Sequence, residues 1–186
     1  MTIDYTADQQ SLRPKLAAAN INPDSFLATD YLNHFNEIVM LLEMVPDMPE
    51  MIEDCADWKP LSYDDHFMQS GFTAKELAVE AYHAAPKEFK EPFDHIIKAL
   101  DLLIGSTLNG LALVNVAERG VSDQARQLIV NRTSLMQEYL AKMNRLIHGK
   151  LLDEEFKASL VDQMSAPVIE DAEEVQSQAD IDALFD

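Results

Sequence analysis

Two long stretches of the sequence repeat apolar residues every three or four positions, and a short junction at Gly120 separates them. That spacing places the apolar side chains on one side of an α-helix, whereas a half-buried strand would alternate apolar and polar residues. The first stretch begins near Pro86 or Pro92, and the second ends at Gly149. The predicted core positions are Phe93, Ile96, Ile97, Leu100, Leu103, Ile104, Leu108, Leu111 and Val114 in the first helix, and Leu128, Ile129, Leu135, Met136, Tyr139, Leu140, Met143, Leu146 and Ile147 in the second.

The junction between the two stretches carries signals that end one helix and begin the next. Gly120 suits the position after a helix, because glycine adopts the left-handed backbone without strain. Ser122 suits the N-cap of the second helix, and Asp123 then lies in its first turn, where the helix dipole favours a carboxylate. So short a turn is expected to bring the two helices side by side in opposite directions, as a long αα-hairpin.

The other segments also show helical periodicity. From Ser25 to Val45 the apolar residues fall on one side of a predicted helix. Shorter helices are predicted at 50–57, 63–69 and 73–84. The last of them opens on a capping box, from Thr73 to Glu76. No segment favours a strand. The sequence therefore predicts an all-α fold, an antiparallel helical bundle built on the long αα-hairpin, which occupies residues 1–162.

Acidic residues outnumber basic ones, 33 to 14, so the formal net charge is −19. About half of this excess lies in the last fifth of the chain, where Asp153–Asp186 carries eleven acidic residues and one basic residue. Residues 163–176 have few large apolar side chains and are predicted to form a disordered acidic linker. Nucleic acid and anionic membrane both repel such a charge, so neither is expected as a partner.

Several classes of site and location are not expected from this sequence. Cys55 is its one cysteine, which excludes an intrachain disulfide and a four-cysteine zinc site. The first residues resemble no signal peptide, and no apolar run reaches the roughly 18 residues of a membrane span. We therefore expect a cytoplasmic protein. No phosphate-binding loop, dinucleotide fingerprint, nucleophile elbow or zinc-protease helix is present, and no cofactor is expected.

Residues 177–186 read Ser-Gln-Ala-Asp-Ile-Asp-Ala-Leu-Phe-Asp and combine acidic with apolar side chains. Ile181, Leu184 and Phe185 are spaced so that one helical turn places them on the same face. A helix this short does not persist alone in water, so its apolar face indicates a groove that receives it. Two alternatives stay open: an acidic tail that only aids solubility, and a segment that docks on the protein's own helices.

This peptide resembles the one that flagellar motor switch proteins carry at their N-terminus. It is also similar to the C-terminal peptide that follows an acidic linker in the chemotaxis response-regulator phosphatase. In both families the peptide binds a phosphorylated CheY-type receiver domain. The resemblance covers Ser177–Phe185, while the helical body resembles no family. The partner-binding residues that it implies are the acidic Asp180 and Asp182 and the apolar Ile181, Leu184 and Phe185.

A receiver-binding peptide directs attention to residues that could act on an aspartyl phosphate. Asp123 and Gln127 are four residues apart and share a helix face. The pair resembles the acid and the amide of the chemotaxis phosphatase, whose glutamine orients the attacking water and whose aspartate contacts the receiver's lysine. A carboxamide can orient a water molecule without titrating. The alternative is that Asp123 is an ordinary acid at the start of a helix.

A second candidate for phosphoryl chemistry is His95, with Lys98 one turn later. Histidine phosphotransfer bundles resemble this arrangement, with a lysine three residues after the histidine. A phosphorylated histidine needs a cation nearby for the phosphoryl oxygens, and Lys98 could supply it. The alternative is a surface histidine paired with Asp94 or Glu91.

A third candidate is a metal site. Glu80 and His83 have the Glu-x-x-His spacing of carboxylate-bridged metal bundles, although such sites need two of these motifs and two further glutamates.

Taken together, the sequence predicts a regulatory or adaptor protein of bacterial chemotaxis or two-component signalling that binds a CheY-type receiver domain. Phosphotransfer through His95 and a metal bundle at Glu80 and His83 are the alternatives. Because long helical hairpins often dimerise into four-helix bundles, a homodimer also stays open.

Overall fold

The structure is a computed structural model and describes residues 3–153, 156 and 158. Among these residues every regular element is a helix, which confirms the all-α prediction. The elements are α1 (Ala7–Ala18), the 3-10 helix η1 (Thr29–Tyr31), α2 (Leu32–Met44), α3 (Met51–Asp54), α4 (Tyr63–Gln69), α5 (Lys75–Ala84), α6 (Lys87–Leu113), α7 (Val116–Arg119) and α8 (Asp123–Ile147).

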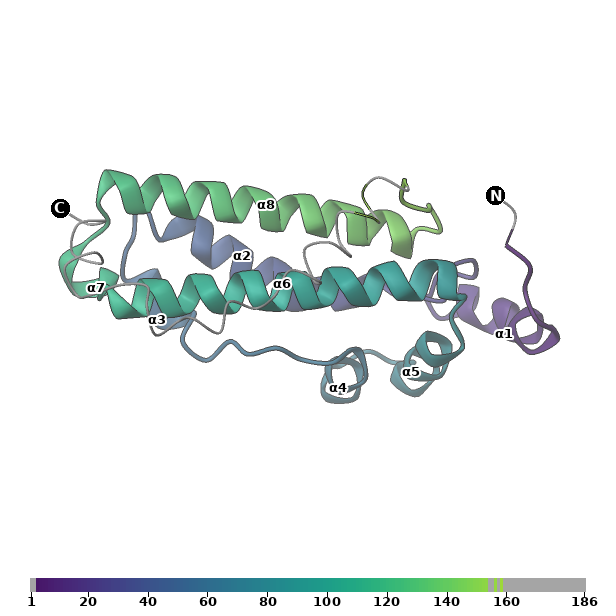
Figure 1. Cartoon of the computed structure of the whole chain (residues 1–186). Helices are drawn as coiled ribbons and strands as arrows, with labels where there is room; N and C mark the ends of the chain where they lie inside the picture. The colour runs from purple at the N-terminus through teal and green to yellow at the C-terminus, as the bar shows by residue number, and fades with distance from the viewer. Residues whose placement is uncertain (1–2, 154–155, 157, 159–186) are drawn as a thin grey trace, which may run out of the picture.

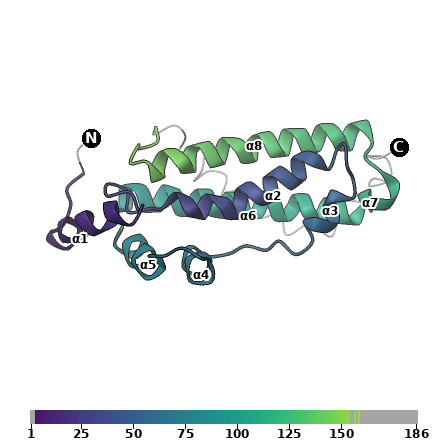
Figure 2. The same ribbon diagram turned by 180° about the vertical axis from the view of Figure 1, so that it is seen from behind.

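The two long helices α6 and α8 lie side by side and run in opposite directions (Figure 1). Helix α2 packs against α8 and lies behind the α6–α8 pair in Figure 1, so it comes to the front in the reverse view (Figure 2). Helices α4 and α5 pack on each other along the opposite edge of α6. Helix α1 contacts α5 at the end where α6 begins. The predicted linker and terminal peptide, residues 163–186, lie outside the described residues.

The first long periodic stretch forms two helices. Helix α6 ends at Leu113, and Asn115 then adopts the left-handed conformation with a φ of 53°. Asparagine tolerates this conformation better than most residues, and the Asn115 amide also donates to Glu118 at 2.7 Å. The prediction of one helix up to Gly120 is therefore wrong beyond Leu113. Gly120 ends the short α7 instead, with a φ of 78°.

The start of α8 agrees with the sequence. Ser122 Oγ accepts a hydrogen bond from the Ala125 backbone N–H at 3.2 Å, so the predicted N-cap is confirmed. Helix α8 ends at Ile147, and Gly149 follows with a φ of 72°. Ser25, which is fully buried, donates its hydroxyl hydrogen to the Ile147 carbonyl at 2.6 Å. This bond anchors the loop before η1 to the end of α8.

Sequence-predicted bounds hold for some of the shorter helices. The predicted helix at 63–69 is confirmed by α4. The predicted helix at 25–45 begins only at η1, because Phe26 is buried with a φ of 66°. Helix α5 begins at Lys75 and has no side-chain cap, so the capping box predicted from Thr73 to Glu76 is wrong.

An aromatic cluster joins the first half of α6 to the elements around it. Phe93 is fully buried, and its ring centroid lies 5.9 Å from that of Tyr31 and 6.1 Å from that of Tyr63. The Tyr31 hydroxyl donates to the Leu61 carbonyl at 2.7 Å, and the Tyr63 hydroxyl accepts from the Ala28 N–H at 3.0 Å. Both phenols therefore keep hydrogen bonds inside an apolar core, where an unpaired hydroxyl would be costly.

The predicted apolar stripes are only partly covered by the rest of the fold. Leu128 and Leu135 were predicted as core positions of α8 but are 50% and 39% exposed, so that prediction is wrong.

Helix α6 is long and apolar enough to cross a membrane by length and composition, and its most apolar window is 28% buried. The buried positions of α6 are Phe89, Pro92, Phe93, Ile96, Leu100, Ile104, Thr107 and Leu111.

Candidate functional site

The partner-binding residues predicted from the terminal peptide lie outside the described residues. They are Asp180, Ile181, Asp182, Leu184 and Phe185. The remaining candidate residues, His95, Lys98, Asp123, Gln127, Glu80 and His83, all lie in the described helices.

His95 and Lys98 lie in the first half of α6. His95 is half-buried and Lys98 is exposed. The pairing of His95 with Asp94 does not occur, because the Asp94 carboxylate accepts from the Tyr82 hydroxyl at 2.7 Å and from Lys90 at 2.8 Å. The imidazole is thus not held by the neighbouring carboxylate, and the Lys98 ammonium lies one turn away on the same side of the helix.

Asp123 and Gln127 are both exposed in the first turns of α8. The Gln127 amide donates to Asn131 Oδ1 at 2.9 Å. A hydrogen bond between Arg132 and Thr107 sets the register of α8 on α6. In this register Gln127 lies beside the C-terminal end of α6, about 25 Å along the helix from His95. The two candidate phosphoryl sites are therefore separate, and one bound phosphoryl group could not contact both.

Glu80 and His83 are exposed on α5. His83 Nε2 lies 2.7 Å from Asp64 Oδ2 of α4, so this histidine joins α5 to α4. In the described part of the chain, no group of three or more His, Cys, Asp or Glu residues is placed to hold a metal ion.

Arg132 lies where α6 and α8 meet the solvent. Its Nε donates to Thr107 Oγ1 at 2.7 Å, and its Nη2 donates to the hydroxyl of Ser106, which is exposed. Burial lowers the pKa of the Arg132 guanidinium, which still remains charged at neutral pH. No carboxylate of the described residues lies within 4 Å of it. Its two side-chain hydrogen bonds to α6 hold the charge in place between the two long helices.

Four exposed leucines of α6 and α8 lie on the same side of the helix pair as Arg132. Leu128 and Leu135 lie four residues before and three after Arg132, on its side of α8. Leu102 and Leu113 lie four before and seven after Ser106, on its side of α6. Since Arg132 and Ser106 are bonded, the two rows meet in one surface, which we call the α6–α8 seam. Its defining residues are Leu102, Leu113, Leu128, Leu135 and Arg132.

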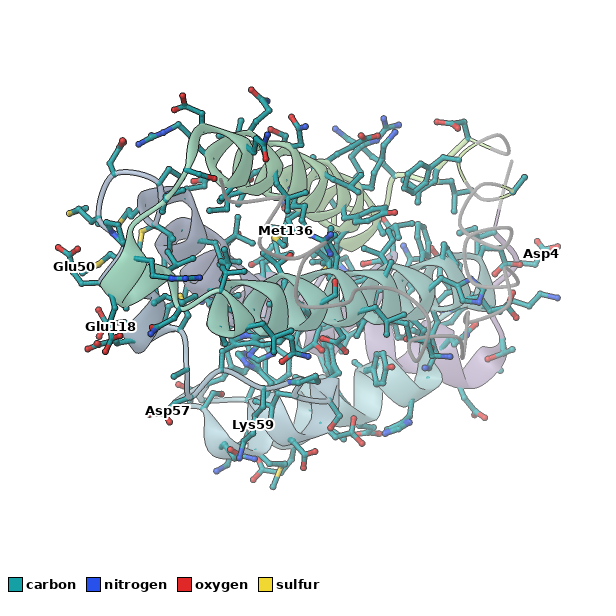
Figure 3. The ribbon with its side chains drawn as sticks, turned by 60° about the vertical axis from the view of Figure 1, so that its left-hand side comes forward. Asp4, Glu50, Asp57, Lys59, Glu118 and Met136 are labelled. Carbon is teal, nitrogen blue, oxygen red and sulfur yellow. The ribbon has the colours of Figure 1, made fainter. Side chains whose placement is uncertain are left out.

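The α6–α8 seam differs in charge from the rest of the protein. Residues 102–113 include no charged side chain, and residues 124–137 include two arginines and no acid. By contrast, Glu50 and Glu118 lie beyond the seam, at the end of the molecule formed by α3 and α7 (Figure 3). The seam is an apolar surface with a basic centre, which suits a partner that is both apolar and acidic.

A second polar cluster, around His34, was not predicted from the sequence. The Trp58 ring stacks on the His34 ring with centroids 5.4 Å apart, while Asp57 and Lys59 lie on the same connection between α3 and α4 (Figure 3). His34 Nε2 is buried and has no hydrogen-bond partner among the described residues. Burial, and then the nearby His66, lower the pKa of His34 to about 4. These side chains come from separate elements, so no spacing along the sequence could predict that they form a cluster.

Replacing His34 with phenylalanine is expected to remove part of the acid sensitivity of the fold. The pKa of His34 lies below its ordinary value of 6.5, so only the unfolded chain gains this proton as the pH falls below 6.5. Partial solvent access reduces the effect to about 1 kcal/mol between pH 7.5 and pH 5. Urea unfolding at both pH values should therefore show that His34→Phe gains about this much relative to the wild type at pH 5.

The exposed His148 provides the matched control for this measurement. His148→Gln should change the free energy of unfolding by less than about 0.5 kcal/mol at either pH, because it replaces an exposed surface side chain. If His34→Phe kept the full pH dependence of the wild type, the neutral buried state of His34 would be contradicted.

No family model, no curated protein and no solved structure matches this chain.

Proposed function

We propose that this protein is a regulatory adaptor that binds a CheY-type receiver domain of bacterial chemotaxis or two-component signalling through residues 177–186, in the cytoplasm. The observation that carries the proposal is the peptide itself. It combines an apolar trio, Ile181, Leu184 and Phe185, with the acidic Asp180 and Asp182, and it follows an acidic segment. That layout suits a short helix that enters a partner groove with a basic rim.

The proposed architecture has three parts: an antiparallel helical bundle at 1–162, an acidic linker at 163–176 and the recognition peptide at 177–186. A tether of this length would hold a captured receiver at an effective concentration approaching about 1 mM beside the helices. A weak second contact with the helical body would then contribute to binding.

The candidate phosphoryl residues lie at two separate places on the α6–α8 pair. Gln127 and Asp123 lie at one end of the α6–α8 pair, whereas His95 and Lys98 lie toward the other. One docked receiver would present its phosphoryl group to one of these ends at most. A phosphate-release assay with Gln127→Ala and with His95→Ala would identify the end that acts, if one does.

The proposal is tested by titrating receiver domains from the same cell, with and without a phosphoryl mimic, into the full chain. Replacing both Leu184 and Phe185 with serine should weaken binding at least tenfold, because their burial in the groove supplies roughly 1.5–3 kcal/mol each before ordering costs are subtracted. A chain that ends at Ser165 should bind no better than this variant.

The control replaces Glu173 and Glu174 with glutamine, which lowers the negative charge and keeps the apolar trio. Its affinity should stay within about threefold of the wild type at physiological salt, since exposed charges are screened. Equal binding by the wild type and the chain that ends at Ser165 would refute the proposal.

A further inference from the structure

We propose that the α6–α8 seam is the docking surface for residues 177–186 of the same chain, with Arg132 pairing with a carboxylate of that segment. The seam would hold the peptide when no partner occupies it. Docking itself needs only the seam and the peptide, whereas its effect on a receiver rests on the proposed function.

The first support is the chemistry of the two surfaces. Leu102 and Leu113 of α6 are 70% and 76% exposed, and Leu128 and Leu135 of α8 are 50% and 39% exposed. Exposed large apolar side chains that gather on one side of a protein mark an interaction site. The segment 177–186 offers three large apolar side chains at helical spacing, which is an apolar face of the kind that these leucines can cover.

The second support is charge complementarity at the centre of the seam. The Arg132 guanidinium is anchored by Ser106 and Thr107, so its position is fixed before any ligand arrives. It lacks a carboxylate partner among the residues that the structure describes. Asp180 and Asp182 flank Ile181 in the segment, so a carboxylate accompanies the apolar face onto the seam.

The third support is the course of the chain after α8. Tyr139 lies seven residues beyond Arg132, on the same side of α8, and its ring centroid lies 6.3 Å from that of Phe156. Lys142 Nζ lies 4.5 Å from the Phe156 ring centroid. The chain therefore turns back over the seam side of α8 as it leaves the helix. From Phe156 to Ser177 there are 177 − 156 = 21 residues, which reach up to about 70 Å, more than the length of the seam.

The test is a photo-crosslink within the full chain, made by Phe185→p-benzoylphenylalanine. An equal mixture of chains with normal and heavy nitrogen, irradiated at low micromolar concentration, separates crosslinks within one chain from crosslinks between two. We expect crosslinks within one chain, to peptides that contain residues 102–113 or 128–135. Crosslinks between chains would assign the seam to a second copy and overturn the proposal, and so would crosslinks elsewhere in the body.

Variants of the seam show whether it holds the peptide. Leu128→Glu and Leu135→Glu change exposed positions and should leave folding intact, while Arg132→Gln removes the central charge. Each should lower the crosslink yield at least fivefold. The matched control is Val130→Glu, because Val130 is 45% exposed on α8 but lies on another side of the helix. A yield unchanged by the three seam variants would overturn the proposal.

The same variants separate this inference from the proposed function. If the peptide is docked about 90% of the time, Leu128→Glu should bind an activated receiver up to about tenfold more tightly than the wild type. If no variant binds any receiver while the crosslinks map to the seam, the proposed function fails and the docking stands. If receivers bind and the crosslinks are absent, docking fails and the proposed function stands.

Discussion

Replacing Phe93 with alanine is expected to lower the free energy of unfolding by about 3–5 kcal/mol, through lost burial and the cavity left behind. Phe93 is fully buried, and its ring lies within 6.5 Å, centroid to centroid, of the rings of Tyr31, Tyr63 and Tyr82. Its removal takes contacts from η1, α4 and α5 together. Thermal unfolding should report the loss as a fall in Tm of about 10 °C for a chain of this size.

The control for this variant is Met40→Ala, which truncates an apolar side chain that is 55% exposed on α2. It should change the free energy of unfolding by no more than about 0.5 kcal/mol. A loss below about 1 kcal/mol for Phe93→Ala would contradict the placement of this ring at the centre of the aromatic cluster.

Replacing Asp101 with asparagine is expected to stabilise the protein at pH 7 by about 2 kcal/mol. Burial raises the pKa of Asp101 to about 6, and its Oδ1 has no hydrogen-bond partner among the described residues. The charge also lies close enough to Tyr31 to raise the pKa of that phenol, after the larger effect of burial. Neutralising a desolvated carboxylate removes its cost, although solvent that reaches part of the group makes the gain smaller than the full pKa difference implies.

The pH dependence of this gain follows from the raised pKa. At pH 7 the wild-type carboxylate is charged in both states, and the folded state carries the penalty. As the pH falls below 6, the folded state takes up a proton before the unfolded state does, so the penalty declines. Urea unfolding should therefore show a gain for Asp101→Asn that falls to about half at pH 5.

A matched control for Asp101 lies on the same helix. Glu91→Gln removes one negative charge from an exposed position of α6 and should change stability by less than about 0.5 kcal/mol at either pH. An equal gain in both variants would assign the effect to the net charge of −19 instead of the buried site.

The sequence predicts best those parts of the fold that are set by local interactions. Ser122 caps α8 through its own hydroxyl, and α4 has the bounds predicted for it, Tyr63–Gln69. Local rules fail where tertiary contacts decide the backbone. Phe26 takes a left-handed conformation inside the core. Helix α5 begins at Lys75, so Thr73 does not cap it as predicted.

The candidate surfaces show the same division. The periodicity identified the apolar stripes, but it could not show which residues lack a neighbour, so Leu128 and Leu135 were assigned to the core. Arg132 and Ser106 are 26 residues apart, and their contact depends on the register between α6 and α8. The cluster of His34, Trp58 and His66 depends likewise on how three elements pack.

Cys55 makes this chain convenient for chemical labelling. The thiol is buried, its Sγ donates to the Met51 carbonyl at 3.3 Å, and burial raises its pKa to about 11. At neutral pH it therefore holds about a hundredfold less of the reactive thiolate than an ordinary thiol. A cysteine introduced on an exposed helix would react with maleimide well before Cys55 does, so a fluorophore or spin label could be attached at one chosen position while the native thiol stays in place.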